Sequence, residues 1–317
     1  MRRRRLALVT SLVATTCFAT LLSLPSSAEA APSDAELAQR WAPVHYQDTA
    51  DANPTADYLS AVDFDGDWDT RNNQQSLPTH RDRLNGTVYY SVVETGTHWF
   101  ITYAYFHPRD WKLFGGHEND MEGVMEVVRK DGTPYGTLEA MLTQAHNNYY
   151  SYVPRGGTWT EGRESIDGDL LTQPYGGDSH PTSFQEAKGH GTYRWDGEGF
   201  GGGDGVVYYP GAPGAPGEVP DSGNDRSVQY QLVDFFAPGG LWERRHDPVT
   251  FAEYGAFRGD DGSDNAANTP WAWDDKDDGS DLQKGSIAED PAYLVDQYFG
   301  NKGDFSLDYV RNPYATG

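Results

Sequence analysis

The sequence predicts a mainly β fold, with a β-sandwich core and a few short peripheral helices. The chain is rich in glycine and aromatic residues, with 36 Gly, 20 Tyr and 9 Trp among its 317 residues. Its apolar segments are short runs bounded by Gly, Pro, Asn and Asp, which is the pattern of strands and turns. Long stretches with helical periodicity are scarce.

Residues 1–30 have the three parts of a secretory signal peptide. They comprise a basic start at Arg2–Arg5, an apolar segment and a small-residue cleavage site that ends at Ala30. We therefore expect an exported, extracellular protein without a transmembrane anchor, and a single domain over residues 31–317. Removal of the signal also removes Cys17, the one cysteine. The remaining chain is long enough to bury a core without a disulfide.

The chain is strongly acidic, with a net charge of −24 that becomes −27 once the signal's net charge of +3 is removed. Such a field repels nucleic acid and anionic lipid and favours cations. The acidic loops 258–264 and 274–281 are predicted to be solvated turns. In Asp63–Asp69, alternating carboxylates around Gly66 resemble a calcium loop. Gln74 stands where an EF-hand loop has its glutamate, so a surface turn is favoured over a structural calcium.

The first predicted elements are a helix and a hairpin. A capping box that starts at Ser33 predicts a short helix over residues 33–41. Two runs of β-branched and aromatic residues, 87–94 and 98–106, are predicted strands joined by a Thr95-Gly96 turn.

Further elements are predicted later in the chain. Strands are expected at 120–129, 136–146, 186–195 and 204–209. Composition predicts loops at 197–205 and 210–220. Asp290 followed by Pro291 predicts the start of a late helix over 290–299, because proline suits the first turn of a helix. No internal repeat is visible.

The most specific segment lies between the predicted strands 98–106 and 120–129. It holds two histidines and four carboxylates, in Phe106-His-Pro-Arg-Asp110 and Gly116-His117-Glu118-Asn119-Asp120-Met121-Glu122. Carboxylates with imidazole and without thiolate suit Ca²⁺, Mg²⁺ or Mn²⁺ better than structural zinc. A hydrogen-bond network around glycine-rich turns is the alternative, and the residues alone do not decide between the two.

Strand alternation arranges these side chains. Asp120 and Glu122 project to the same face of their strand, which Glu126 also shares. His117 lies in the turn before the strand, where two glycines free the backbone to aim it. Asp110 is tied to the end of the preceding strand. Asp120 and Glu122 can therefore both reach one ion.

His146 is a further candidate. If Asp131-Gly132 forms a two-residue hairpin, position 117 faces position 146. Along a regular strand, however, His146 has the wrong parity to join the partners of Asp120 and Glu122. It reaches the site only if a bulge intervenes, and Asn147-Asn148 could accompany one.

At these residues the sequence resembles the necrosis- and ethylene-inducing protein family, which comprises secreted cytolysins of plant-associated microbes. The family's heptapeptide GHRHDWE is matched at Gly116, His117, Asp120 and Glu122 and departs at Glu118, Asn119 and Met121. Pro108-Arg-Asp110 is similar to the family's Pro-Lys-Asp. The resemblance implies a divalent cation, Ca²⁺ or Mg²⁺, held by Asp110, His117, Asp120 and Glu122.

Other segments resemble the related vacuolar protein sorting 62 family. They are residues 37–43, 186–193 and Pro270-Trp271. The second of them adds His190 to the pocket. Thr143–Tyr149, which contains His146, is similar to a later strand of the cytolysins. The similarity is scattered over residues 35–313, and both families imply a β-sandwich core.

Two functions of different classes are possible on this basis. In the first, an exported metal-binding protein binds sugar or lipid head groups of glycolipids or glycans at a target surface, as the resemblance implies. In that case, Trp111 and Phe114 either insert into the target surface or pack under their own loop. In the second, a secreted metal-dependent hydrolase acts on a phosphodiester or glycan, with Glu118 or His146 as general base. Glu118 is equally suited to orienting a ligand. No other catalytic motif is present, and the resemblance favours the first function.

Overall fold

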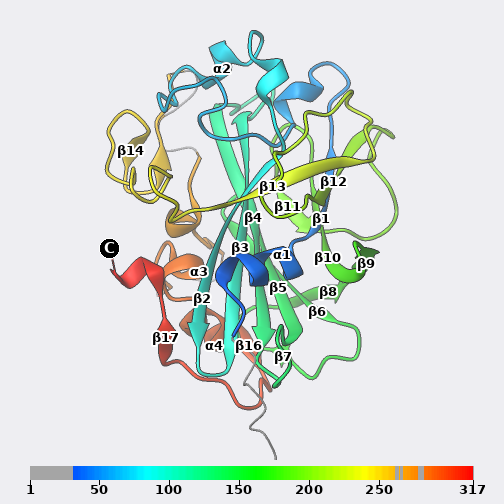
Figure 1. The fold of residues 1–317 in the computed structure, drawn as a ribbon, viewed down its shortest axis with the longest axis vertical. Helices are drawn as coiled ribbons and strands as arrows, with labels where there is room; N and C mark the ends of the chain where they lie inside the picture. Colours follow the sequence, from blue (N-terminus) through cyan, green and yellow to red (C-terminus); the bar gives the residue numbers. More distant parts are fainter. Residues whose placement is uncertain (1–30, 261–263, 265–266, 278–281, 317) are drawn as a thin grey trace, which may run out of the picture. The chain divides into compact units, whose positions relative to one another are not determined.

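The computed structural model describes residues 31–260, 264, 267–277 and 282–316 (Figure 1). The predicted signal peptide and Cys17 lie outside these residues. Residues 1–31 and 32–317 form separate units, and all of the described helices and strands belong to the second unit. Among the described residues, no helix is both long and apolar enough to cross a membrane.

The described helices are short. The α-helices are α1 (Asp34–Trp41), α2 (Asn73–Ser76), α3 (Ser286–Glu289) and α4 (Pro291–Tyr298). Single turns of 3₁₀-helix are η1 (Pro54–Ala56), η2 (Arg81–Arg83), η3 (Pro270–Ala272) and η4 (Pro313–Thr316).

Strands make up most of the regular structure. They are β1 (Val44–Asp48), β2 (Thr87–Thr95), β3 (His98–Arg109), β4 (Glu118–Arg129), β5 (Thr137–Ala145), β6 (Asn148–Pro154), β7 (Thr160–Glu161), β8 (Ile166–Leu170), β9 (Thr172–Tyr175), β10 (Asp178–Gln185), β11 (Thr192–Arg194), β12 (Gly205–Pro210), β13 (Val228–Asp234), β14 (Phe251–Glu253), β15 (Ala256–Phe257), β16 (Phe299–Gly300) and β17 (Tyr309–Arg311).

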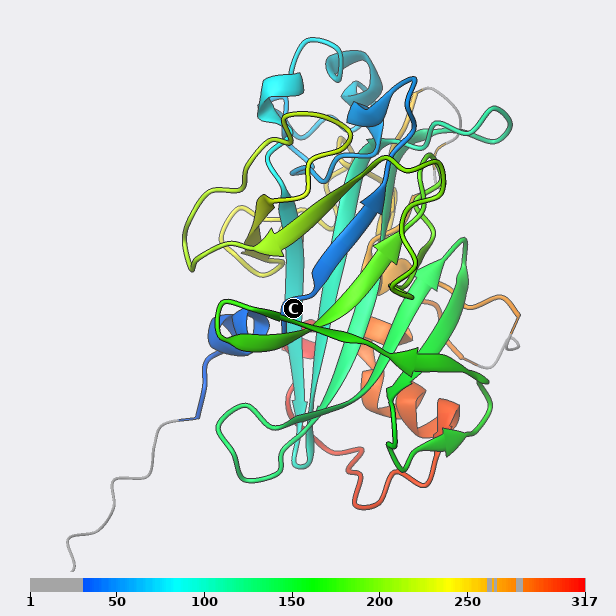
Figure 2. The same ribbon diagram turned by 90° about the vertical axis from the view of Figure 1, so that its right-hand side faces the viewer.

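One large mixed sheet organises the fold. Its order is β11-β10-β1-β12-β13-β2-β3-β4-β5-β6-β8, with β9 and β17 paired to β10 and β2. β2 to β6 form an antiparallel meander. The sheet curls so that the edge strand β11 lies against β4 and β5 (Figure 2). It is therefore nearly closed into a barrel-like sandwich, and the predicted mainly β fold class is confirmed.

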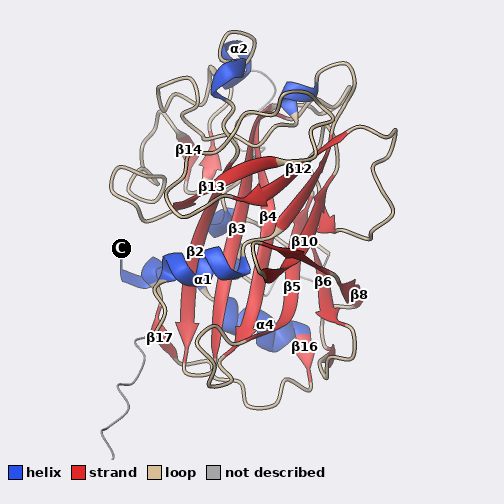
Figure 3. Ribbon diagram, turned by 45° about the vertical axis from the view of Figure 1, so that its right-hand side comes forward, coloured by secondary structure: helices blue, strands red, loops and turns tan. Residues whose placement is uncertain are grey.

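Both faces of the long meander are buried. Alternate residues of β2 go to different cores: Val88, Tyr90 and Val92 to one, Tyr89 and Val93 to the other. The first core lies under α1, and the second is covered by the carboxyl-terminal segment that includes α4. Figure 3 shows α1 and α4 on opposite faces of the strands. Burial on both faces explains why β2 and β3 carry apolar or aromatic residues at most positions.

Several predicted elements are confirmed. Ser33 and Glu36 form the capping box of α1, each side chain bonding the backbone of the other. The hairpin of β2 and β3 and the strand that returns as β5 are present. Pro291 begins α4, but the Asp290 side chain does not cap it and accepts instead from the Tyr309 hydroxyl.

The predicted strand 186–195 is wrong in its first half. β10 ends at Gln185 and β11 begins at Thr192, so residues 186–191 form a loop between them. Lys188 and His190 have positive φ values of 73° and 54°. A β-strand cannot accommodate these left-handed residues, and the chain turns here.

The two-residue hairpin at Asp131-Gly132, on which the pairing of His117 with His146 depended, is not formed, since Arg129 pairs with Thr137. Asp131 accepts hydrogen bonds from the side chains of Thr133 and Thr137, which closes a longer loop between β4 and β5. Together with a register shift between Val127 and Val128, this loop pairs Gly123 with Gln144. His146 therefore does not face His117. His146 and Asn147 form a two-residue turn to β6 instead of a bulge, with φ values of 54° and 66°, as type I′ turns require.

The Asp63–Asp69 loop is a surface turn, as predicted. The Asp65 and Asp67 carboxylates accept the backbone N–H groups of Asp67 and Asp69, the self-bonding typical of such turns. Asp69 is also paired with Arg71 at 2.6 Å.

Glu126 is the unexpected member of the face that begins at Asp120. It is fully buried and lies opposite Ile101 and Met141 on the neighbouring strands. Neither of its carboxylate oxygens has a hydrogen-bond partner among the described residues. Burial raises the pKa of Glu126 well above its usual value, which favours the protonated carboxyl in the folded protein.

We expect Glu126→Gln to remove a pH dependence of stability. The unfolded chain loses this proton at about pH 4.3 and the folded chain only at a higher pH, so the contribution of Glu126 to wild-type stability falls as pH rises between the two, by up to about 1.4 kcal/mol per pH unit. Urea unfolding at pH 5 and pH 7 measures the slope in both proteins. Glu253→Gln, at an exposed position, is the control and should retain it. A wild-type slope that Glu126→Gln leaves unchanged would contradict the assignment.

Candidate metal centre

The site is built at the ends of β3 and β4, where loop 110–117 connects them. The backbones of Asp110 and His117 bond each other in both directions, at 2.9 and 3.2 Å, so the two side chains start from facing positions. A Cβ on Gly116 would lie 2.6 Å from the Lys112 carbonyl oxygen. Only glycine permits this close approach.

Three side chains converge next to this loop. Ligand atoms of Asp110, His117 and Asp120 all lie within 4.8 Å of one another. The two aspartates are buried and His117 is partly exposed. The structure thus brings together three of the four residues predicted to hold a metal ion.

The His117 ring is oriented as a metal ligand would be. Its Nδ1 lies 2.8 Å from the Asn119 carbonyl oxygen. Because a carbonyl only accepts, Nδ1 carries the proton, and the lone pair of the neutral ring is on Nε2. Nε2 lies 3.6 Å from Asp110 Oδ2. Two carboxylates and this lone pair form a donor set that fits a divalent cation.

His190 lies between two buried carboxylates. Its Nδ1 is 3.0 Å from Asp120 Oδ2, and its Nε2 is 3.2 Å from Asp57 Oδ1. An ionised carboxylate accepts only, so both ring nitrogens donate and the ring is an imidazolium. Burial disfavours this charge, but the bonds to Asp120 and Asp57 outweigh it and raise the pKa of His190 to about 9.

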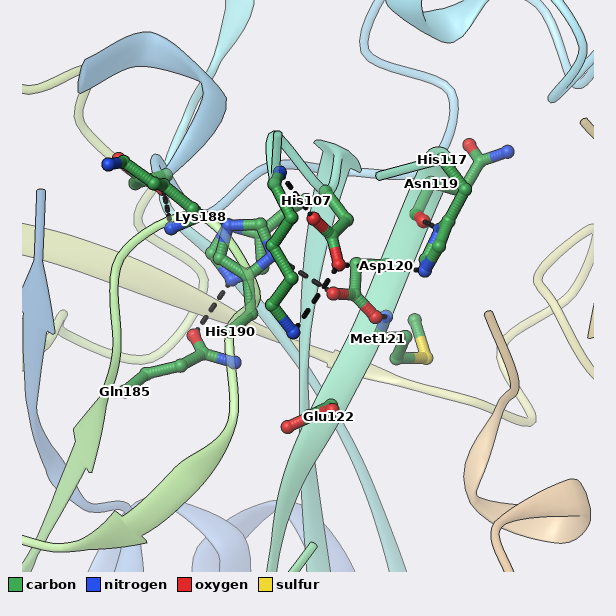
Figure 4. Close-up of polar contacts among 12 residues, drawn as sticks. His107, His117, Asn119, Asp120, Met121, Glu122, Gln185, Lys188 and His190 are labelled. Carbon is green, nitrogen blue, oxygen red and sulfur yellow. Dashed lines mark hydrogen bonds and ion pairs between the residues drawn. The ribbon is translucent and has the colours of Figure 1, made fainter. Parts of the chain in front are cut away.

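The ring of His107 packs against that of His190. The His107 ring stacks on His190, with centroids 3.8 Å apart and planes 6° from parallel, and its Nε2 lies 2.8 Å from Gln185 Oε1 (Figure 4). His107 pairs across the sheet with Asp120. Burial, and then the positive charge of His190, lower the pKa of His107 well below its usual value. His107 is therefore neutral.

The carboxylates of the site have divergent pKa values. Burial opposes ionisation of Asp120, but the hydrogen bond and charge of His190 lower its pKa to about 2. Burial, and then the charge of Asp120, raise the pKa of Asp110 and, more strongly, that of Glu122. A divalent cation would offset the repulsion that contributes to both increases.

Glu122 is not a member of the three-residue cluster. It shares the face of Asp120, as predicted, since both contact residues 190–192. Its Oε1 accepts from His146 N at 3.0 Å, and its Oε2 accepts from Thr192 N at 3.1 Å. In this position Glu122 ties two loops to β4, and its role as a ligand stays a prediction.

Glu118 faces away from the cluster. Asn119 has a φ of 60°, which breaks the regular alternation of β4 at this point. The two Glu118 oxygens accept the backbone N–H groups of Gln74 and Asp260, at 2.9 and 2.8 Å. Glu118 therefore holds distant loops together.

His146 reaches the rim of the site from its turn. Its Nε2 lies 2.6 Å from Glu186 Oε1, and its Nδ1 lies 3.8 Å from Glu122 Oε1. The Lys112 ammonium lies 3.3 Å from the same Nδ1 and 3.8 Å from Asp110 Oδ2. A cation at the cluster would share Asp110 with this lysine.

Sequence reasoning missed Asp57 and did not single out His107. Asp57 follows η1, far along the chain from the heptapeptide, and nothing local marks it. The β3–β4 pairing could have identified His107, since it faces Asp120. His190 came from the family resemblance alone, and the structure places it in the centre of the network.

If the cluster holds a cation, chelation should destabilise the protein. EDTA should lower the melting temperature, and added Ca²⁺ or Mg²⁺ should restore it, because a ligand at 100 times its Kd stabilises by about 2.7 kcal/mol. Asp120→Asn should abolish this response. Glu118→Gln removes a buried carboxylate from the same strand and should keep the response. Identical melting curves with EDTA and with either ion would exclude the site.

Lys112→Met should tighten cation binding. The substitution removes a positive charge near Asp110 and keeps the length and apolar character of the side chain. Calorimetric titration of chelated protein with Ca²⁺ should show an affinity about tenfold higher than that of wild type, corresponding to about 1.4 kcal/mol. Lys188→Met is the control, since its backbone, rather than its ammonium, contacts Asp57. An unchanged or weaker affinity in Lys112→Met would count against a cation beside Asp110.

Comparisons with known proteins concern the fold. No protein-family model matches the chain, and a search of curated proteins finds no match. Among solved structures, it is similar to Necrosis and Ethylene inducing Protein 2 from the causal agent of cocoa's Witches Broom disease, with 13% identity over 77% of this chain and 88% of that one, at a TM-score of 0.38.

Two further structures extend the comparison. One, described as a toxin fold as basis for microbial attack and plant defense, is 17% identical over 78% of this chain and 91% of that one, at a TM-score of 0.36. NLPPya in complex with glucosamine is 18% identical over 55% and 74%, at 0.33. The chain spans about half of the non-toxic HaNLP3 protein, 49% of its length. Over much of its length, the chain is similar in structure to the necrosis- and ethylene-inducing toxin fold.

Proposed function

We propose that this is an exported protein that binds a divalent cation and, through it, a sugar or lipid head group at a target surface. One observation carries the proposal: the cluster of Asp110, His117 and Asp120, which we call the cation cluster, lies at the base of a loop whose tip is apolar and exposed. Leu113 and Phe114 are 89% and 88% exposed. The same loop supplies Asp110 and His117 from its two ends.

The cation cluster and the apolar loop tip could bind the same target surface together. A cation bound by only three side chains keeps coordination positions for hydroxyl or phosphate oxygens, since Ca²⁺ takes 6–8 oxygen ligands. Moving the adjacent apolar side chains from water to the boundary of a lipid layer lowers the free energy of the system. Trp111 is half-buried and packs against the core, so Phe114 rather than Trp111 is the aromatic available to an interface.

The net charge of the protein limits the kinds of lipid surface that it can bind. The net charge of −27 without the signal opposes approach to anionic lipid. It does not oppose a neutral lipid that carries an uncharged sugar head group. The proposed target is therefore a neutral glycolipid, or a glycan with the same head group.

The hydrolase alternative has less support. Glu118, one of its two candidate bases, accepts two backbone N–H groups and faces away from the cluster. His146 is closer, but its Nε2 is paired with Glu186. A general base must reach the proton that it removes, and the remaining ring nitrogen, Nδ1, already lies 3.3 Å from the Lys112 ammonium, which donates to it.

Phe114→Ser should weaken binding to vesicles and leave cation binding intact. Burying a phenyl ring contributes about 1.5–3 kcal/mol, so affinity for phosphatidylcholine vesicles with a neutral glycosphingolipid, in Ca²⁺, should fall at least about tenfold. Leu307→Ser, at a distant residue that is 47% exposed, is the control. Glucosamine serves as a soluble competitor.

Two results would contradict the proposal. Binding that survives both EDTA and Phe114→Ser would place the contact elsewhere on the protein. Release of lipid or sugar products from the vesicles would identify an enzyme.

A further inference from the structure

An open pocket of about 670 Å³ lies on a different part of the molecule. It is bounded by α1, the loop between β4 and β5, the turn between β9 and β10, and the residues around the end of β12. Its side chains are mixed, with aromatic, amide and charged groups together: Gln39, Arg40, Tyr135, Tyr175, Asp178 and Gln229. The volume falls within the range of about 300–1,000 Å³ that small-molecule sites occupy.

The pocket is separate from the candidate metal centre. Asp178, at the start of β10, lines the pocket, whereas Gln185, at the end of the same strand, bonds His107 of the metal centre. At about 3.3 Å per residue, these ends are about 23 Å apart. A ligand in one site does not contact the other.

Tyr175 gives the pocket an aromatic wall. It is held by Tyr209 at a ring distance of 4.6 Å and by the edge of His180 at 6.0 Å. The turn that follows consists of Gly176 and Gly177, with φ values of 61° and 99°. A Cβ on either glycine would meet no atom within 4 Å. The rim beside the tyrosine therefore carries no side chain that would block a flat ligand.

The polar groups of the pocket are held in place. Gln39 Nε2 donates to the Gly211 carbonyl at 3.1 Å, which leaves its amide oxygen to accept. Arg40 donates to the Ser179 carbonyl at 3.1 Å, is 3.3 Å from Asp178, and stacks on Trp41 at 4.2 Å. Groups fixed before binding lose little entropy when a ligand arrives.

Charge excludes anionic ligands from this pocket. Its one arginine, Arg40, is already paired with Asp178, and Glu36 adds a further carboxylate to the wall. Burial lowers the pKa of His180 below its usual value, so this ring adds no positive charge at neutral pH. The acidic protein as a whole also repels polyanions.

We propose that this pocket binds a short, uncharged oligosaccharide without a metal ion. A pyranose ring presents C–H groups on its faces, which suit the negative face of an aromatic ring. Its rim of hydroxyls both donates and accepts, as fixed amide, guanidinium and carboxylate groups require. The pocket supplies these partners around a tyrosine, and its open shape admits a ligand that extends beyond it.

The test is titration of the purified protein with cellohexaose, chitohexaose and mannohexaose in EDTA. We expect saturable heat of binding with at least one of them. Tyr175→Ala should lower its affinity about tenfold or more, and Tyr175→Phe should retain it. Ala35→Trp fills the pocket from an exposed position on α1 without removing core packing, and it should also abolish binding.

The controls separate this site from the metal centre. Tyr254→Ala, at an exposed tyrosine outside the pocket, should bind as wild type does, and added Ca²⁺ should leave the affinity of the wild-type protein unchanged. No binding of any of the three sugars, or binding that both Tyr175→Ala and Ala35→Trp leave unchanged, would overturn the proposal. Binding that requires Ca²⁺ and is lost in Asp120→Asn would also overturn it, because the sugar would then lie at the metal centre.

Discussion

The imidazolium of His190, held between Asp57 and Asp120, is the interaction on which the candidate metal centre depends. It joins three parts of the chain: the segment after η1, strand β4 and the loop between β10 and β11. A buried charge is tolerated only when it is paired and hydrogen-bonded. Here both ring nitrogens have a carboxylate partner, so the charge itself requires the three segments to stay together.

The same network orders the side chains that could bind a cation. His190 fixes one oxygen of Asp120, and the Asn119 carbonyl fixes the tautomer of His117. Such supporting bonds position ligands before the ion arrives. Charged groups at short distances in a buried site interact strongly, so the loss of one partner would disturb all of them. The apolar loop tip next to these groups supports the proposed surface-binding role over a catalytic one.

The long strands keep two different surfaces apart. One end of β10 lies in a buried network of carboxylates and imidazoles, and the other lies beside an open pocket with an aromatic wall. Because β2 to β6 are packed on both faces, they are rigid supports for both ends. The two sites differ in chemistry because α1 and strands β9, β10 and β13 supply most side chains of the pocket, whereas loops and the ends of β3 and β4 supply those of the metal centre.

Local signals in the sequence were enough to predict several of the elements and part of the site. The capping box at Ser33, the hairpin of β2 and β3 and the shared face of Asp120 and Glu122 follow from periods and turn residues over a few positions. The heptapeptide resemblance pointed to Asp110 and His117. These features depend on residues that are close in sequence, so they can be predicted without knowing the fold.

Only the tertiary structure decided how the site is completed. Curling of the sheet brings β11 against β4 and β5, and thereby places His190 beside Asp120. The loop that Asp131 closes and the register shift between Val127 and Val128 together give the β4–β5 register, in which His146 lies in a turn. Asp57 enters from a segment with no recognisable motif. Such contacts join residues far apart in sequence, and their geometry depends on packing of the whole sheet, which no local pattern encodes.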